Sequence, residues 1–92
     1  MEKYNWIFGI CSSTGDCVDM FRFNGTKEGA KAKLLSFIEE DRYNADEPWE
    51  YGTETLENVQ EYDDGYELYG YGCYQTYHTD YSAKEVSHIV IV

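Results

Sequence analysis

Hydrophobic and polar positions in the first half of the chain alternate with the period of a strand and then change to the period of a helix. Residues Lys3 to Cys11 place aromatic and β-branched side chains at alternate positions, which predicts a β-strand. A cluster of turn residues, 12–16, joins it to a second strand from Cys17 to Phe23, and so short a loop predicts an antiparallel hairpin. Thr26 is placed to cap a helix from Lys27 to about Arg42. The apolar stripe of that helix consists of Ala30, Leu34, Phe37 and Ile38.

The next part of the chain shows weaker periodicity and stronger turn signals. Residues 44–55 contain the single proline and are expected to form a loop. Residues 56–62 fit a strand or a short helical turn, and the pattern leaves both open. The step Asp63-Asp64-Gly65 predicts a hairpin turn, because an Asp-Gly pair supplies the positive φ angles that such turns need.

Tyr66 to His78 forms the clearest predicted strand. Alternation assigns its side chains to two faces. One face would carry Tyr69, Tyr71, Cys73, Gln75 and Tyr77, and the other Tyr66, Leu68, Gly70, Gly72, Tyr74 and Thr76. Residues 82–85 then match a capping box for one or two helical turns, and residues 89–92 predict a short buried strand. The elements together predict an α+β fold, an antiparallel sheet of four to five strands with one main helix packed on one face.

Length and composition fit one α+β domain that covers residues 1–92. Apolar residues make up 42% of the chain and aromatic residues 17%, which favours a packed core over disorder. No apolar run approaches the ~20 residues of a membrane span, and the first residues lack the pattern of a secretory signal. We therefore expect a cytoplasmic protein with no membrane partner. The chain has three cysteines, Cys11, Cys17 and Cys73, and we expect them to be reduced in the cytoplasm. Their odd number means that at least one forms no disulfide within the chain. A disulfide between Cys11 and Cys17 across the predicted hairpin remains an alternative.

The formal net charge of −11 belongs to one part of the chain. Twelve acidic residues and a single basic one, Arg42, lie in the 29 residues from Glu39 to Glu67, whereas acids and bases balance elsewhere. The acidic residues of this segment are Glu39, Glu40, Asp41, Asp46, Glu47, Glu50, Glu54, Glu57, Glu61, Asp63, Asp64 and Glu67. Such a block repels nucleic acid and anionic membranes and attracts basic surfaces. The alternative is a solvated face that keeps a small protein soluble.

The charges of the predicted helix run against its macrodipole. Lys27, Lys31 and Lys33 lie in the first half, and Glu39, Glu40 and Asp41 lie at the end. A macrodipole favours the reverse order, at a few tenths of a kcal/mol per charge. Such an order can mark selection for some other use of these side chains, and it is equally consistent with drift.

Catalytic and metal-binding patterns are not found. The cysteine and histidine spacings do not match a zinc knuckle. A nucleophilic set could be drawn from Cys73, His78 and Asp80, but alternation points Cys73 and His78 to opposite faces of the predicted strand, and no oxyanion loop accompanies them. The Asp-Asp-Gly turn lacks calcium ligands at the required spacing, and the glycines form no phosphate-binding motif. We expect no enzyme, no metal and no cofactor.

Tyrosines gather in the predicted strand and just after it. Six of the ten, Tyr66, Tyr69, Tyr71, Tyr74, Tyr77 and Tyr81, lie within 16 residues. Tyrosine offers a large contact area with a polar tip, so it is enriched at protein interfaces. Single-stranded nucleic acid also stacks on aromatic rings, but it needs a basic groove that this chain lacks. The pattern therefore favours a protein partner over direct binding of nucleic acid.

In size, charge and compact α+β plan the chain resembles the small acidic proteins that phages and mobile elements use against host defence, such as anti-CRISPR proteins and DNA mimics. The residues that carry the resemblance are Glu39-Glu40-Asp41, Asp46-Glu47 and Glu61-Tyr62-Asp63-Asp64. The resemblance implies that carboxylates stand in for phosphates and block the nucleic-acid-binding site of a partner protein.

The sequence thus predicts a non-catalytic acidic binding protein, an inhibitor that occupies a basic nucleic-acid-binding groove of a partner. The predicted partner-binding residues are Glu61, Asp63, Asp64, Glu67, Tyr69, Tyr71, Glu39, Glu40, Asp41, Asp46 and Glu47. The alternative is a structural or assembly module that forms a homodimer through the tyrosine-rich strand.

Overall fold

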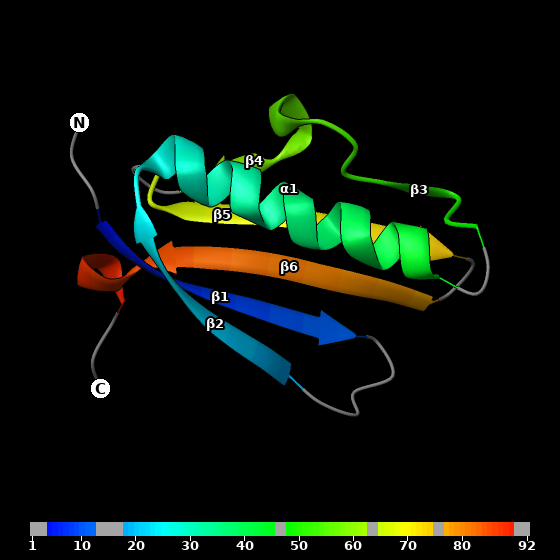
Figure 1. The fold of residues 1–92 in the computed structure, drawn as a ribbon, viewed down its shortest axis with the longest axis horizontal. Coiled ribbons are helices and arrows are strands. Elements are labelled where there is room, and N and C mark those ends of the chain that lie inside the picture. Colours follow the sequence, from blue (N-terminus) through cyan, green and yellow to red (C-terminus); the bar gives the residue numbers. More distant parts are fainter. Residues whose placement is uncertain (1–3, 13–17, 46–47, 63–64, 75–76, 90–92) are drawn as a thin grey trace.

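The protein is an antiparallel β-sheet with one long helix packed on one side (Figure 1). The computed structural model describes residues 4–12, 18–45, 48–62, 65–74 and 77–89. The strands are β1 (Tyr4–Ser12), β2 (Val18–Gly25), β3 (Tyr51–Gly52), β4 (Gln60–Tyr62), β5 (Glu67–Tyr74) and β6 (Tyr77–Glu85). The helix is α1 (Lys27–Asn44), and two 3₁₀ turns are η1 (Leu56–Asn58) and η2 (Val86–His88). The strand order is β2-β1-β6-β5-β3, and β4 also pairs with β5.

The helix begins and packs as its sequence pattern predicts. Thr26 is the N-cap, and its hydroxyl oxygen accepts a hydrogen bond from the backbone N–H of Gly29 at 3.1 Å. Such a bond satisfies one of the amides that the first turn leaves unpaired. Ala30, Leu34 and Ile38 are fully buried against the sheet, so the apolar stripe is the face that packs.

The core lies between this stripe and the inner face of the sheet. Its largest side chains, Trp6, Phe8 and Tyr81, are fully buried and come from the two central strands β1 and β6. Tyr66 covers the end of the core next to Trp6, with ring centroids 6.4 Å apart. His88 of η2 in turn stacks on Tyr66 at 4.4 Å, so the 3₁₀ turn after β6 closes this end.

Two glycines in β5 let larger groups approach the sheet. A methyl group on Gly72 would lie 2.0 Å from the ring of Trp49, and one on Gly70 would lie 2.6 Å from Cδ1 of Ile38. Glycine inside a strand often marks such a close approach. Arg42 holds Trp49 from the other side, because its guanidinium lies 5.3 Å from the ring centroid. The indole ring is therefore fixed between the end of α1 and the backbone of β5.

The short outer strand β3 depends on the same contacts. Arg42 donates a hydrogen bond from Nη2 to the backbone oxygen of Thr53 at 3.1 Å. Thr53 is buried and exchanges bonds with Tyr71, donating its N–H to the Tyr71 carbonyl at 2.8 Å and accepting the Tyr71 N–H on its hydroxyl at 3.1 Å. A segment predicted as loop is thus attached to the edge of β5.

The α+β class, the antiparallel sheet and the single main helix are confirmed, with six strands rather than four to five. The range 56–62, left open by the pattern, contains both η1 and β4. Gly65 has φ of 81°, as the turn prediction requires, and Asp63 and Asp64 lie outside the described residues.

Other predictions for the C-terminal third were wrong. The single strand Tyr66 to His78 is two strands, because the chain reverses between Tyr74 and Tyr77, which pair with each other. Tyr77 therefore shares a face with Tyr74 and not with Tyr69. Residues 82–85 belong to β6, and the helical turn begins only at Val86. Ile89 lies in a bend, and the other residues of the predicted last strand lie outside the described part.

In the part of the chain that the structure describes, no helix is both long enough and apolar enough to cross a membrane.

The contact between Gly72 and Trp49 gives a first prediction. Replacing Gly72 by Ala should lower the free energy of unfolding by about 1–3 kcal/mol, because the added methyl group overlaps the indole ring. The matched control is Gly9→Ala in β1, where the nearest atom, Oγ of Ser82, lies 3.6 Å from the added methyl group. Urea denaturation measures both. Equal stability of the two variants would contradict the close packing of Trp49 on β5.

Candidate functional site

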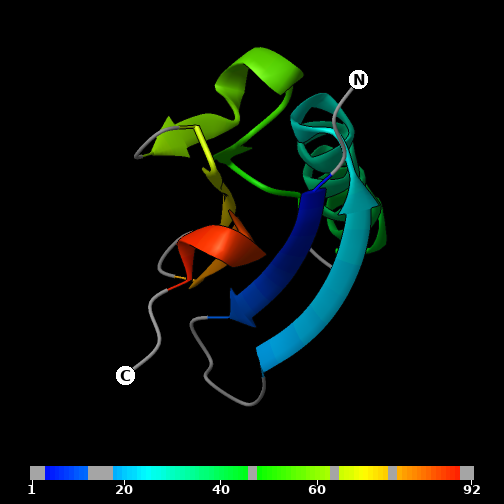
Figure 2. The same ribbon diagram turned by 90° about the vertical axis from the view of Figure 1, so that its left-hand side faces the viewer.

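The face of the sheet opposite α1 carries a row of tyrosines that runs across three strands. The helix lies on one side of the curved sheet (Figure 2). On the other side Tyr62 of β4 contacts Tyr69 of β5, Tyr69 lies beside Tyr71, and Tyr71 contacts Tyr51 of β3. The successive ring centroids are 6.2, 6.2 and 6.1 Å apart. We call these four residues the tyrosine row and this side of the sheet the open face.

The row is accessible to a partner. Tyr51 is 56% exposed and Tyr62 is 46% exposed, and the two tyrosines between them are partly exposed. Tyr69 and Tyr71 have ring planes only 22° apart, whereas Tyr51 stands at 69° to Tyr71. Tyr62 stands at 63° to Tyr69, so the row consists of two nearly parallel rings with one ring set across each end.

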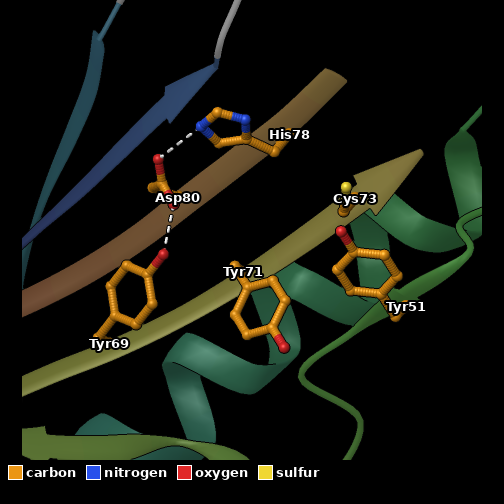
Figure 3. A pocket seen from close by; sticks show the side chains of 6 residues that line it. All are labelled: Tyr51, Tyr69, Tyr71, Cys73, His78 and Asp80. Carbon is orange, nitrogen blue, oxygen red and sulfur yellow. Dashed lines mark hydrogen bonds and ion pairs between the residues drawn. The ribbon is translucent and has the colours of Figure 1, made fainter. Parts of the chain in front are cut away.

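A hollow of about 250 Å³ lies where the row meets β6. Its lining consists of Tyr51, Tyr69, Tyr71, Cys73, His78 and Asp80 (Figure 3). Asp80 connects two of the groups, because its Oδ1 accepts a hydrogen bond from the Tyr69 hydroxyl at 2.5 Å and its Oδ2 lies 3.3 Å from Nε2 of His78. Figure 3 shows the three tyrosines along β5 and its outer edge, and Asp80 and His78 on the neighbouring strand.

The surroundings raise the pKa of two of these tyrosines. Burial, and then the hydrogen bond to Asp80, raise the pKa of Tyr69 well above its usual value. The hydrogen bond with the Cys73 side chain is the largest cause that raises the pKa of Tyr51. Tyrosine hydroxyls are ordinarily protonated at neutral pH, and these shifts extend that state to higher pH. The Tyr69 hydroxyl donates to Asp80, the acidic residue at the hollow.

The prediction that Cys73 and His78 point to opposite faces was wrong. The two residues are paired across the hairpin of β5 and β6, so their side chains lie on the same face, together with that of Asp80. In Figure 3 the thiol lies next to the Tyr51 hydroxyl, and the imidazole points toward Asp80. Among the described residues, no three His, Cys, Asp or Glu side chains are grouped as a metal ion would need.

Several predicted acidic residues are bound within the fold. Glu61 of β4 lies 3.3 Å from Nζ of Lys27 and also pairs with Lys31, and both lysines belong to the helix. Asp41 accepts a hydrogen bond from the Tyr81 hydroxyl at 2.5 Å, and burial together with this bond raises the pKa of Tyr81. The reversed order of charges along α1 thus has a structural use at both ends.

The remaining predicted residues are divided among different places. Glu67 lies on the open face, 3.5 Å from Nζ of Lys84, with Tyr69 and Tyr71 on the same strand. Glu39 and Glu40 are exposed on α1, in the other layer of the molecule. Three acidic residues that the sequence prediction did not select, Glu50, Glu54 and Glu57, are exposed on the segment that runs along the outer edge of β5. Asp46, Glu47, Asp63 and Asp64 lie outside the described residues.

The predicted partner-binding residues do not include five residues of the row and the hollow, which are Tyr51, Tyr62, Cys73, His78 and Asp80. The two tyrosines belong to strands of two and three residues, too short for a periodic signal. The sequence indicates His78 and Asp80 only as members of a nucleophilic set. No glycine, proline or asparagine marks the reversal between Tyr74 and Tyr77 that brings them beside the tyrosines of β5.

The pairing of Glu61 with two helix lysines gives a second prediction. The hydrogen bond from Lys31 is the main cause that holds the pKa of Glu61 below its ordinary value of about 4.3, with Lys27 adding to it. This contribution to stability is complete above the unfolded-state pKa, and it is lost as the pH falls through the lowered folded-state pKa. Glu61→Gln should therefore be less stable than wild type at pH 7, by a difference that shrinks toward pH 2.

Urea denaturation at a series of pH values measures this difference, with the exposed helix residue changed in Glu39→Gln as the control. A difference between wild type and Glu61→Gln that stays constant with pH would contradict the ionic role of Glu61.

The open face brings aromatic rings, a carboxylate, an imidazole and a thiol to one place without a deep cavity. Such a surface is suited to holding another molecule by contact, hydrogen bonding and charge. No protein-family model, no curated protein and no solved structure matches this chain.

Proposed function

We propose that this protein is a non-catalytic binding protein whose open face contacts a basic surface of a protein partner. The observation that carries the proposal is the tyrosine row, four rings in continuous contact on the side of the sheet opposite the helix. Protein interfaces are enriched in tyrosine, and their hot spots lie where aromatic side chains are surrounded by other contacts. An antiparallel sheet with one covered face supplies a rigid base for such a row.

Charge indicates the kind of partner. The chain carries a net charge of −11, and the exposed Glu50, Glu54 and Glu57 lie on the segment next to the row. An acidic border of this kind attracts a basic surface and repels nucleic acid. Basic surfaces of proteins often bind nucleic acid. The best-supported role is therefore an inhibitor that occupies a nucleic-acid-binding groove and competes with the phosphates that normally fill it.

The same row also supports a second candidate function, a homodimer formed by two open faces. Met20 of β2 is 67% exposed and pairs with Gly9 of β1, and the register across β1, β6 and β5 places it on the same side of the sheet as Tyr69. Paired tyrosine surfaces can bury enough area for a stable dimer when both copies present them. This assembly would hide the row and leave the acidic border at the rim.

A binding experiment tests the first candidate. The immobilised protein is exposed to the heparin-binding fraction of a lysate of its source cells, and a captured protein is purified for kinetic measurement. Reversing Glu50, Glu54 and Glu57 to Lys should slow association at low salt about tenfold or more, since complementary charge mainly sets the association rate. Tyr69→Ser with Tyr71→Ser should instead speed dissociation, because it removes contact area.

The matched control reverses three exposed helix residues, Glu28, Glu39 and Glu40, and so changes the net charge by the same amount in the other layer. Binding should fall less in this control than in the variant with Glu50, Glu54 and Glu57 reversed. Competing DNA should displace the protein from its partner. An equal loss in both variants, or simultaneous binding with DNA, would make the proposal wrong.

Sedimentation separates the two candidates. The first predicts a monomer at concentrations up to about 100 μM, where a specific dimer with Kd near 1 μM would be almost fully formed. The second predicts a dimer that Tyr69→Ser with Tyr71→Ser converts to a folded monomer. Circular dichroism checks that the variant is folded, and a wild-type monomer would remove the dimer candidate.

A further inference from the structure

The hollow on the open face is small and is lined by aromatic rings and a carboxyl group. Its volume, about 250 Å³, is below the roughly 300–1,000 Å³ of pockets that hold whole small molecules. A single side chain that enters from a bound protein is the size of occupant that fits. The hollow also lies within the surface that we propose for partner binding.

The rings around the hollow face a possible occupant from two directions. Tyr69 and Tyr71 lie side by side with planes 22° apart, and Tyr51 stands at 69° to Tyr71 (Figure 3). The two rings form a floor and the third forms a wall. The faces of aromatic rings carry negative charge density and attract cations within about 6 Å of the ring centroid. Three tyrosines at such angles therefore favour a cation over a neutral apolar group.

The polar side chains of the hollow also favour a cationic occupant. The Asp80 carboxylate lies at the side of the hollow on β6, half-exposed, and its position is fixed by the Tyr69 hydroxyl at 2.5 Å. His78 lies next to it, with Nε2 at 3.3 Å from Oδ2. A carboxylate accepts up to about four hydrogen bonds, so Asp80 retains capacity for a further donor after these contacts. It supplies the negative charge that a bound cation needs.

Planarity decides between the two cationic side chains of proteins. A guanidinium stacks on ring faces and forms paired hydrogen bonds with a carboxylate, whereas an ammonium is compact and strongly hydrated. The chain already uses this chemistry elsewhere, because the Arg42 guanidinium lies over the Trp49 ring at 5.3 Å. The nearly parallel rings of Tyr69 and Tyr71 give a flat floor on which a guanidinium, but not an ammonium, can lie.

We propose that the hollow formed by Tyr51, Tyr69, Tyr71 and Asp80 binds an arginine side chain of the partner protein. The guanidinium lies on the rings of Tyr69 and Tyr71, and its N–H groups donate to Asp80. This inference rests on the proposed function, since it names the group by which a basic partner is anchored. It names arginine as the residue of the partner, and the hollow as the place, through which the attraction between opposite charges acts.

The test uses a small probe in place of the partner. Acetyl-arginine methylamide is titrated into the isotopically labelled protein at constant chloride concentration, and the ring resonances of the tyrosines are followed by NMR. Acetyl-citrulline methylamide has the same shape without the charge, and acetyl-lysine methylamide has the charge without the planar group. Saturable shifts at the hollow are expected with arginine, at millimolar concentrations, and at least threefold weaker binding with the other two.

Two variants assign the binding to the hollow. Asp80→Asn keeps the acceptor for the Tyr69 hydroxyl and removes the charge, so it should weaken arginine binding at least threefold. Tyr71→Leu should weaken it further by removing half of the floor. The matched controls are Glu54→Gln, an exposed carboxyl group on the edge segment, and Tyr43→Leu, an 89% exposed tyrosine on α1. Both controls should bind arginine as wild type does.

Equal shifts with citrulline or lysine, shifts that map to the helix, or an unchanged affinity in Asp80→Asn would overturn the arginine site. The failures of the two proposals are distinguishable. If a captured partner depends on Tyr69 and Tyr71 but arginine does not bind, the anchor is wrong and the open-face proposal stands. If arginine saturates the hollow but no basic protein is held, the arginine site stands and the proposed function is wrong.

Discussion

The register between β5 and β6 decides which side chains reach each side of the sheet. It places Gly70 opposite Tyr81 and Leu68 opposite Ala83 on the covered face, and Tyr71 opposite Asp80 on the open face. A slip of one residue would exchange the two sets, because side chains alternate along a strand. The tyrosines would then meet the helix, and the glycines would lie outside. The core and the binding face are therefore set by one hairpin.

The helix and the first hairpin could be predicted because their signals are local. The stripe of Ala30, Leu34 and Ile38 and the cap at Thr26 need no knowledge of the rest of the chain. The β5–β6 hairpin could not be predicted, because no glycine, proline or asparagine marks its turn and the tyrosine alternation continues across it. The capping-box motif over residues 82–85 failed for another reason. Strand pairing with β1 on one side and β5 on the other overrides a local preference worth about 1 kcal/mol.

Acidic residues that lie in one segment of the sequence do not form one acidic surface in the structure. Asp41, Glu61 and Glu67 are engaged by Tyr81, by the helix lysines and by Lys84. Glu39 and Glu40 lie in a different layer from Glu50, Glu54 and Glu57. The sequence indicated the sign of the charge correctly but could not show this division, since it depends on where β3 and β4 attach. The two tyrosines that complete the row, Tyr51 and Tyr62, depend on the same attachment.

Residues of the helix hold the short strands β3 and β4 in place, and this limits which positions of the protein can vary independently in evolution. Lys27 and Lys31 hold β4 through Glu61, and Arg42 holds the segment after β3 through Thr53. The two ends of the tyrosine row are thus positioned by residues on the far layer that a partner on the open face does not touch. Selection on a partner can replace the exposed rings freely, whereas Lys31 with Glu61 and Arg42 with Trp49 must vary together. In a set of descendants, paired substitutions at Lys31 with Glu61, or at Arg42 with Trp49, would preserve the face while its own residues diverge.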